Sequence, residues 1–128
     1  MDLVTIPAAK GGMDTPKSPS SKSPLIVLEL AYQAITLLRP IVESIRKEDR
    51  DLADQIRRAA SSIALNLAES RGSRDGNRTA RLKNALGSAH EVRSALRVAY
   101  SWGYVANIAD VDAKLDRIAG MTFGLLSR

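Results

Sequence analysis

The 128-residue sequence contains no cysteine, one histidine (His90) and only 4% aromatic residues. The absence of cysteine excludes disulfides, thiolate metal sites and cysteine nucleophiles, and a single histidine excludes an acid–base pair of two histidines. No uninterrupted run of about 18 apolar residues is present, so no transmembrane helix is expected. The weakly apolar start, Met1 to Lys10, lacks a basic segment before it, which argues against a signal peptide. The expectation is a soluble cytoplasmic protein.

Hydrophobic residues make up 45% of the chain and charged residues 26%, which suits one domain with a buried core. Ala, Leu, Ile and Val dominate, and this balance favours an all-α fold. Residues 1–24 contain four prolines and a Gly11-Gly12 pair. We therefore expect a disordered N-terminal tail over 1–24 and a folded domain over 25–128. Met13 is an alternative start site within that tail.

Four segments after the tail carry apolar residues at helical spacing. The expected helices cover, in chain order, residues 25–46, 48–72, 73–103 and 107–125. Pro40 predicts a kink or a break near residues 36–40 of the first helix. Because the connections are short, neighbouring helices are expected to run antiparallel, and the prediction is an antiparallel up-and-down four-helix bundle.

Polar residues at the segment ends predict helix caps. Ser73 or Asp75 is expected to cap the third helix, and Asn107 the fourth. Acidic side chains stabilise the positive end of a helix, so a group of four acids predicts the start of the second helix. A divalent-metal site is the alternative interpretation of this group. The four acids are Glu48, Asp49, Asp51 and Asp54.

The first expected helix is apolar over about twice the 100° stripe that a surface helix needs. Leu28, Leu38 and Ile45 lie on one half of this arc, and Val27 and Leu37 lie on the other. An exposed stripe of that length would be an aggregation hazard. The pattern therefore predicts a homo-oligomer, although it does not give the number of copies.

Two segments resemble a known family. They are Gln55-Ile-Arg-Arg-Ala-Ala-Ser-Ser-Ile-Ala-Leu-Asn-Leu-Ala-Glu69, and Leu86-Gly-Ser-Ala-His-Glu91 followed by Gly103-Tyr104. They resemble the four-helix-bundle proteins encoded in intervening sequences of bacterial 23S rRNA, a group related to the accessory proteins of diversity-generating retroelements. Ser70 and Ala80 depart from the family, which usually has glycine and phenylalanine there. The resemblance implies a homopentameric ring, with a nucleic acid or a reverse transcriptase as partner, and it does not imply an enzyme.

The middle of the chain is strongly basic. Residues 55–104 contain nine basic and three acidic side chains, and residues 71–83 contain five basic and one acidic. Arginine suits bidentate phosphate contacts, and no aromatic residue lies between 55 and 99 to stack on bases, so backbone contacts to structured RNA are favoured. The alternative is a solvated face that keeps the protein soluble. The candidate nucleic-acid-binding residues are Arg57, Arg58, Arg71, Arg74, Arg78, Arg81 and Lys83.

A polar set flanks the apolar stripes of the second and third helices. It either lines a pocket or channel, or forms hydrogen bonds between helices or protomers that fix their register. Arg93 lies near the same stripe and is expected to pair with one of the acids in this set. The set consists of Asn66, Glu69, Ser88 and Glu91.

The sequence has no G-x-S-x-G motif, no phosphate loop and no Glu-x-x-His pair. Tyr100, Trp102 and Tyr104 are interpreted as a packing plug at the end of the third helix, not as a cofactor site. The prediction is a non-catalytic accessory protein that binds structured RNA, without a metal, a cofactor or a membrane. The alternative is an oligomeric scaffold that docks a protein partner, or a small ligand in a central channel.

Overall fold

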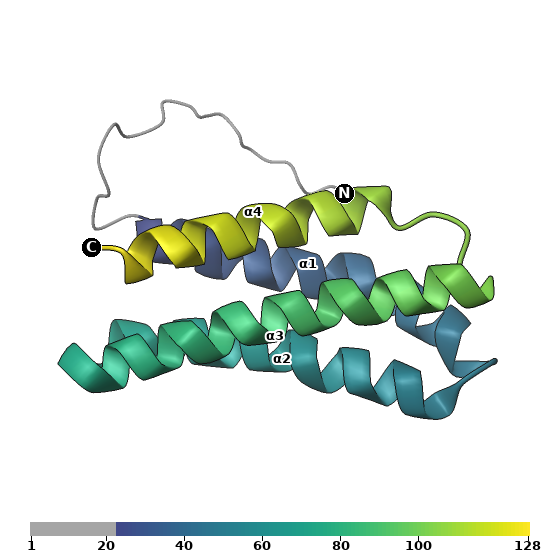
Figure 1. Ribbon diagram of the computed structural model, residues 1–128, viewed down its shortest axis with the longest axis horizontal. Helices are drawn as coiled ribbons and strands as arrows, with labels where there is room; N and C mark the ends of the chain where they lie inside the picture. The colour runs from purple at the N-terminus through teal and green to yellow at the C-terminus, as the bar shows by residue number, and fades with distance from the viewer. Residues whose placement is uncertain (1–22) are drawn as a thin grey trace.

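The computed structural model describes residues 23–128, which form four α-helices and no β-strand. The helices are α1 (Ser23–Arg46), α2 (Arg50–Arg71), α3 (Asp75–Trp102) and α4 (Ala109–Leu126). Each helix packs against the next one in the chain, and α4 also packs against α1. Figure 1 shows α1 and α4 in one layer and α2 and α3 in the other. The prediction of an all-α protein with four helices is confirmed.

The three connections lie at the two ends of the bundle. Residues 72–74 join α2 to α3 at one end, and residues 47–49 and 103–108 lie at the opposite end (Figure 1). Since α3 has 28 residues, the two ends are about 40 Å apart at 1.5 Å per residue. Side chains near different connections therefore belong to separate surfaces.

Helix α1 begins at Ser23, two residues before the predicted domain boundary. Pro24 lies in its first turn, where a backbone N–H has no partner within the helix. The rest of the predicted tail, residues 1–22, lies outside the described residues. Helix α1 is also continuous through Pro40, so of the predicted kink or break, the break is absent. Pro40 and Thr36 are both exposed, so water can solvate the Thr36 carbonyl, which lacks the usual N–H partner.

The core consists mainly of aliphatic side chains at helical spacing. Alanines such as Ala60, Ala64, Ala85 and Ala89 are buried in α2 and α3, and their small size lets these two helices approach closely. The largest fully buried side chains are Ile45, Ile56, Ile63, Leu67, Leu82, Leu96, Leu115 and Ile118. All four helices contribute to this one core.

The broad apolar arc of α1 is mostly buried within a single copy. Leu28 and Leu38 from one half of the arc are buried, and so are Val27 and Leu30 from the other half. The reason is that α1 packs against both α2 and α4, so its two faces have separate neighbours. Helix α1 is also the one helix of residues 23–128 that is long and apolar enough to cross a membrane, a criterion that core helices meet as well.

The helix ends confirm some predicted caps and correct others. Asp49 caps α2, because its carboxylate accepts a hydrogen bond from the Leu52 N–H at 2.9 Å. Neither Ser73 nor Asp75 caps α3: the N-cap is Arg74, which makes no side-chain cap bond. The Ser73 hydroxyl instead donates to the Glu69 carbonyl at 2.8 Å and so completes the last turn of α2.

The connection between α3 and α4 is fixed at both of its ends. Gly103 ends α3 in the left-handed region with φ 81°, and the Tyr104 N–H donates to the Ala99 carbonyl at 2.9 Å. Asn107 accepts a hydrogen bond from the Ala109 N–H at 3.0 Å, so it satisfies a donor at the start of α4 as predicted. The N-cap position itself is Ile108, one residue later than expected.

Replacing Asp49 with alanine is expected to destabilise the protein by about 1 kcal/mol, because the Leu52 N–H loses its acceptor. The free energy of unfolding is measured by urea titration followed by far-UV circular dichroism. Asp51→Ala is the control, since this exposed acid in the first turn of α2 makes no cap bond. Equal losses in the two variants would contradict the assignment of the cap to Asp49.

Candidate nucleic-acid interface

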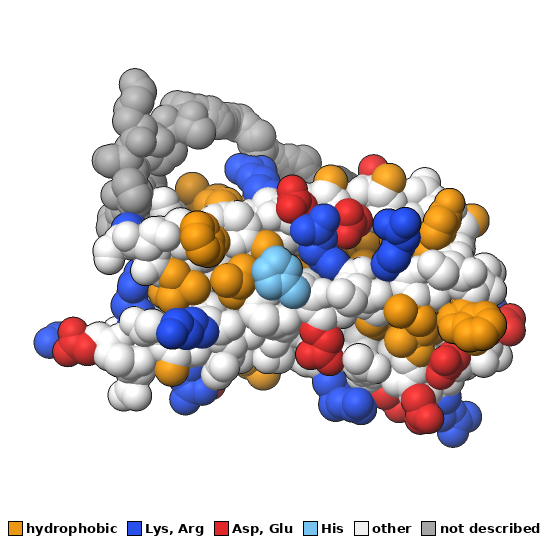
Figure 2. Space-filling view, in the orientation of Figure 1, with side chains coloured by type: hydrophobic (Ala, Val, Ile, Leu, Met, Phe, Trp, Pro, Cys, Tyr) orange, Lys and Arg blue, Asp and Glu red, His pale blue; other side chains and the backbone are white. Residues whose placement is uncertain are grey.

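The basic side chains of residues 71–83 gather at the end of the bundle where α2 turns into α3. We call Arg71, Arg74, Arg78, Arg81 and Lys83 the basic end. Figure 2 shows Lys and Arg side chains at this end, on the left of the view. Within residues 23–128, no ion pair joins Arg71, Arg74, Arg78 or Lys83 to a carboxylate. Their charges are therefore not neutralised by an ion pair within the described residues.

Arg81 differs from the other members of the basic end because it is paired. Its Nη1 atom lies 2.9 Å from Oε1 of Glu69, which is on α2. Both side chains are about half exposed, so the pair adds little stability. It does, however, offset one positive charge and fixes Arg81 beside α2.

Arg57 and Arg58 lie apart from the basic end. Arg58 precedes Arg71 by 13 residues of the same helix, which corresponds to about 20 Å. The hydrogen bond from Arg46, with the nearby charges of Arg46, Arg58 and Arg57, lowers the pKa of Asp54. The structure thus divides the seven predicted basic residues into two groups.

The side chains of the polar set form hydrogen bonds or ion pairs within α2 and between α2 and α3. Asn66 and Ser88 bond to Ser62, a residue that was not among the predicted ones. Ser88 Oγ donates to Ser62 Oγ at 2.8 Å. The Asn66 amide donates to the Ser62 carbonyl at 2.9 Å and to its Oγ at 3.0 Å. Glu69 pairs with Arg81, and Glu91 accepts from the Gln55 amide at 3.4 Å. The four-residue spacing of Ser62 and Asn66 was the available signal, because it places both on one face of α2.

Arg93 pairs with α4, so the expected pairing with an acid of the polar set is wrong. Its Nε and Nη2 atoms donate to the two carboxylate oxygens of Asp112 at 2.9 and 3.2 Å, and its Nη1 donates to Asp116 at 2.9 Å. Arg93 is on the side of α3 that packs against α4, which directs the guanidinium away from α2. The hydrogen bond from Arg93 lowers the pKa of Asp112, and the same bond raises the pKa of Arg93.

The lowered pKa of Asp112 predicts acid sensitivity. A carboxylate whose pKa is lower in the folded state contributes stability above its unfolded pKa of about 3.9, and this contribution is lost as the pH falls through the folded value. When the pH is lowered from about 5 to about 2, the free energy of unfolding should therefore fall less in the Asp112→Asn variant than in the wild type. Urea unfolding at several pH values measures this. Asp110→Asn is the control, and an unchanged pH dependence in Asp112→Asn would contradict the prediction.

The predicted aromatic plug is wrong, because two of its three members are on the surface. Trp102 is 70% exposed and Tyr100 is 49% exposed, whereas Tyr104 packs partly against the core. The rings of Trp102 and Tyr104 stack with centroids 6.4 Å apart and planes inclined by 16°. The buried stripe of α3 ends at Ala99, so the residues after it are not directed to the core.

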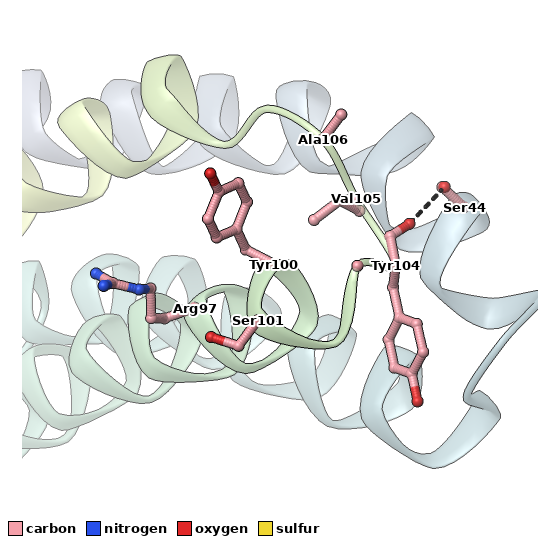
Figure 3. Close-up of a pocket in the computed structure, with 8 residues that line it drawn as sticks. Ser44, Arg97, Tyr100, Ser101, Tyr104, Val105 and Ala106 are labelled. Carbon is pink, nitrogen blue, oxygen red and sulfur yellow. Dashed lines mark hydrogen bonds between the residues drawn. The ribbon is translucent and has the colours of Figure 1, made fainter.

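An open hollow lies beside these residues, between the end of α3 and the 103–108 connection. Figure 3 shows Arg97 and Tyr100 beside this space, with Val105 and Ala106 across from them. Ser44 Oγ donates to the Tyr104 carbonyl at 3.3 Å and ties the connection to α1. Within residues 23–128, no three His, Cys, Asp or Glu side chains are grouped to hold a metal ion.

The helices and the basic end define an all-α, four-helix protein with an arginine-rich surface at one end. Residues 24–124 match the 23S rRNA-intervening sequence protein family, and the chain belongs to this family. The fold is similar to the crystal structure of a protein of unknown function from the S23 ribosomal protein family of Bacteroides thetaiotaomicron VPI-5482, with a TM-score of 0.76. The two chains are 15% identical over 83% of this chain and 99% of the other, a similarity of fold alone. No curated protein matches the chain.

Proposed function

We propose that this chain is a non-catalytic cytoplasmic accessory protein that binds structured RNA through its basic end. The observation that carries the proposal is the group of Arg71, Arg74, Arg78 and Lys83, whose charges no carboxylate of residues 23–128 pairs. The planar guanidinium of arginine can donate two parallel hydrogen bonds to one phosphate. Membership of a family named for 23S rRNA intervening sequences supports an RNA partner.

The basic end is suited to the phosphate backbone and not to base readout. No aromatic residue lies within residues 71–83, so this surface has no ring on which an unpaired base could stack. Double-stranded RNA is recognised mainly through its shape, phosphates and 2′-hydroxyl groups. An RNA hairpin is therefore the proposed ligand class, and Arg57 and Arg58 would take part only if the RNA extends along α2.

Several copies are proposed to assemble with their basic ends close together. Short connections between long, contacting helices support an antiparallel up-and-down bundle. Leu65 and Phe123 are each 61% exposed and offer apolar surface for self-association. In a homopentameric ring, the assembly implied by the family resemblance, the basic end would be repeated five times. Sedimentation equilibrium tests this by measuring the mass relative to the 13.8 kDa of one copy.

The experiment that tests RNA binding is fluorescence anisotropy of a labelled ribosomal RNA hairpin, titrated with protein at several salt concentrations. Each phosphate that is neutralised releases counterions, so the affinity should fall with salt on a log–log slope of about −3 or steeper. Binding that does not depend on salt would contradict phosphate recognition by the basic end. No binding at low salt would overturn the proposal.

A second candidate function is an oligomeric scaffold that docks a protein, such as the reverse transcriptase implied by the family resemblance, or a small ligand in a central channel. The exposed Trp102 favours it, since large exposed aromatic side chains are enriched at protein interfaces. This function predicts that changes to Asn66, Ser88 or Glu91 weaken binding of the partner, while changes to the arginines have little effect on it. Pull-down assays with the polar and basic variants in parallel distinguish the two.

A further inference from the structure

The end of the bundle opposite the basic end is acidic. Residues 43–55 contain five acidic and three basic side chains, and residues 98–110 contain no basic side chain. Arg46 is already paired with Asp54 at 2.6 Å, and Asp49 caps α2. Glu48 and Asp51 are exposed and form no ion pair within residues 23–128. Lys47 and Arg50 are exposed there as well and likewise form no ion pair within the described residues, but acids outnumber basic residues over the two stretches, so this end carries a net negative charge.

The same end carries an exposed apolar surface, which we call the aromatic patch: Val98, Trp102 and Tyr104. Val98 and Trp102 are exposed and lie four residues apart, so they share one face of α3. Tyr104 extends this surface because its ring stacks on Trp102. Folding of a single copy does not explain a tryptophan that is 70% exposed, and such surfaces mark interaction sites.

Two acidic side chains lie toward α2 along the face of α3 that carries the aromatic patch. Glu91 lies seven residues before Val98 on the same face of α3, and its hydrogen bond with Gln55 places this face beside α2. Asp51 lies one turn before Gln55 on α2, toward the end of the bundle where Trp102 is found. Figure 2 shows hydrophobic side chains at this end, on the right of the view, with both acidic and basic side chains around them.

This combination of groups selects a cationic ligand. The face of a tryptophan ring attracts a guanidinium, which can stack on the ring while it donates hydrogen bonds to a neighbouring carboxylate. The phosphates of a nucleic acid would instead meet Asp51 and Glu91, and like charges at close range are repulsive. The aromatic patch therefore differs in chemistry from the basic end and fits a different partner.

We propose that the aromatic patch, together with Asp51 and Glu91 on the side of α2, is a docking surface for an arginine-rich segment of another protein. Charge complementarity and the exposed Trp102 ring, which stacks on Tyr104, carry this proposal, which does not depend on the RNA binding proposed for the opposite end. The basic end of a second copy offers similar charge. Such head-to-tail contacts would form open chains instead of closed assemblies, and they are an outcome of the test below.

The protein contains one tryptophan, so its intrinsic fluorescence reports directly on the aromatic patch. The full-length protein is titrated with an amidated peptide of four Arg-Gly repeats, and with a Glu-Gly peptide of the same length. The arginine peptide is expected to change the Trp102 emission saturably, and to bind at least about tenfold more tightly than the acidic peptide. An unchanged emission together with no binding of a labelled arginine peptide would overturn the proposal.

Two variants locate the site, with labelled-peptide anisotropy as the readout. Trp102→Ala and the double variant Asp51→Asn/Glu91→Gln are each expected to weaken binding of the arginine peptide by about tenfold. The matched controls are Tyr32→Ala, which removes another exposed aromatic ring, and Glu29→Gln/Asp75→Asn, which removes two exposed carboxylates that form no ion pair within residues 23–128. Thermal unfolding checks that every variant is folded. Equal losses in the controls and in the site variants would overturn the assignment.

The same variants separate the competing occupants. Binding of a single-stranded oligonucleotide that is lost in Trp102→Ala would show a nucleic-acid site and overturn the proposal. A Trp102 emission that changes with protein concentration alone would show that a second copy covers the patch, and would overturn it as well. Binding of the RNA hairpin at the basic end should be unchanged in the Trp102→Ala variant, whichever result the peptide gives.

Discussion

Reversing Arg71, Arg74 and Arg78 to glutamate is expected to weaken binding of a ribosomal RNA hairpin by about 100-fold or more at about 0.1 M salt. Each reversal removes one phosphate contact and places a like charge against the RNA backbone. The log–log salt slope should also become shallower by about 3, because three fewer counterions are released. Arg71 and Arg74 are exposed and Arg78 is only half-buried, so the fold and any oligomer should persist.

The control for this variant is Arg39→Glu/Lys47→Glu/Arg117→Glu, which changes the net charge equally at exposed positions outside the basic end. Its affinity should fall only severalfold, through the weaker overall field of the protein. A separate Arg57→Glu/Arg58→Glu variant shows whether the RNA contacts α2 beyond the basic end. Retention of wild-type affinity by the triple reversal at 71, 74 and 78 would show that the basic end is not the binding surface.

Replacing Leu96 with alanine should reduce the free energy of unfolding by about 2–5 kcal/mol. Leu96 is fully buried in α3, and this helix packs against both α2 and α4. The truncation removes apolar contacts and leaves a cavity that the neighbouring helices fill only in part. Urea unfolding followed by far-UV circular dichroism gives the free energy from the transition midpoint and its slope.

Leu65→Ala is the matched control, because the same atoms are removed from a side chain that is 61% exposed. The expected loss in this variant is about 0.5 kcal/mol or less. A loss of similar size in both variants would contradict the position of Leu96 in a close-packed core. If Leu65 forms contacts between copies, the Leu65→Ala variant should form a smaller assembly, which sedimentation equilibrium measures as a lower mass. The free energy of unfolding of a single copy should then be unchanged.

Most of the fold follows from periodicity in the sequence. Apolar residues at helical spacing located all four helices, and Gly72 and Gly103 marked the ends of α2 and α3. The sequence did not locate the start of α3 correctly. The Ser73 hydroxyl could either cap α3 or bond back to the end of α2, and in the structure it bonds to the Glu69 carbonyl. The continuity of α1 through Pro40 depends on the exposure of that side of the helix, which is fixed only once its neighbours are known.

The positions of charged and polar side chains were harder to predict than the helices. A helical pattern places Arg93 at the edge of a stripe, but the register between α3 and α4 decides that Asp112 and Asp116 are its partners. The distance between Arg58 and Arg71 followed from the length of α2, so their separation could have been derived from the sequence. Trp102 was interpreted as part of a packing plug, although the buried stripe of α3 ends before it.

The opposite charges of the two ends make the bundle an electric dipole in addition to its net charge of +5. A polyanion exerts a torque on such a molecule and turns the positive end foremost before contact. A protein molecule that approaches with its side facing the polyanion is thereby rotated until its positive end faces it. A larger fraction of collisions then leads to binding. Beyond a screening length of about 10 Å at 0.1 M salt the torque fades. Salt should therefore slow the association of this protein with a polyanion as well as shorten the life of the complex.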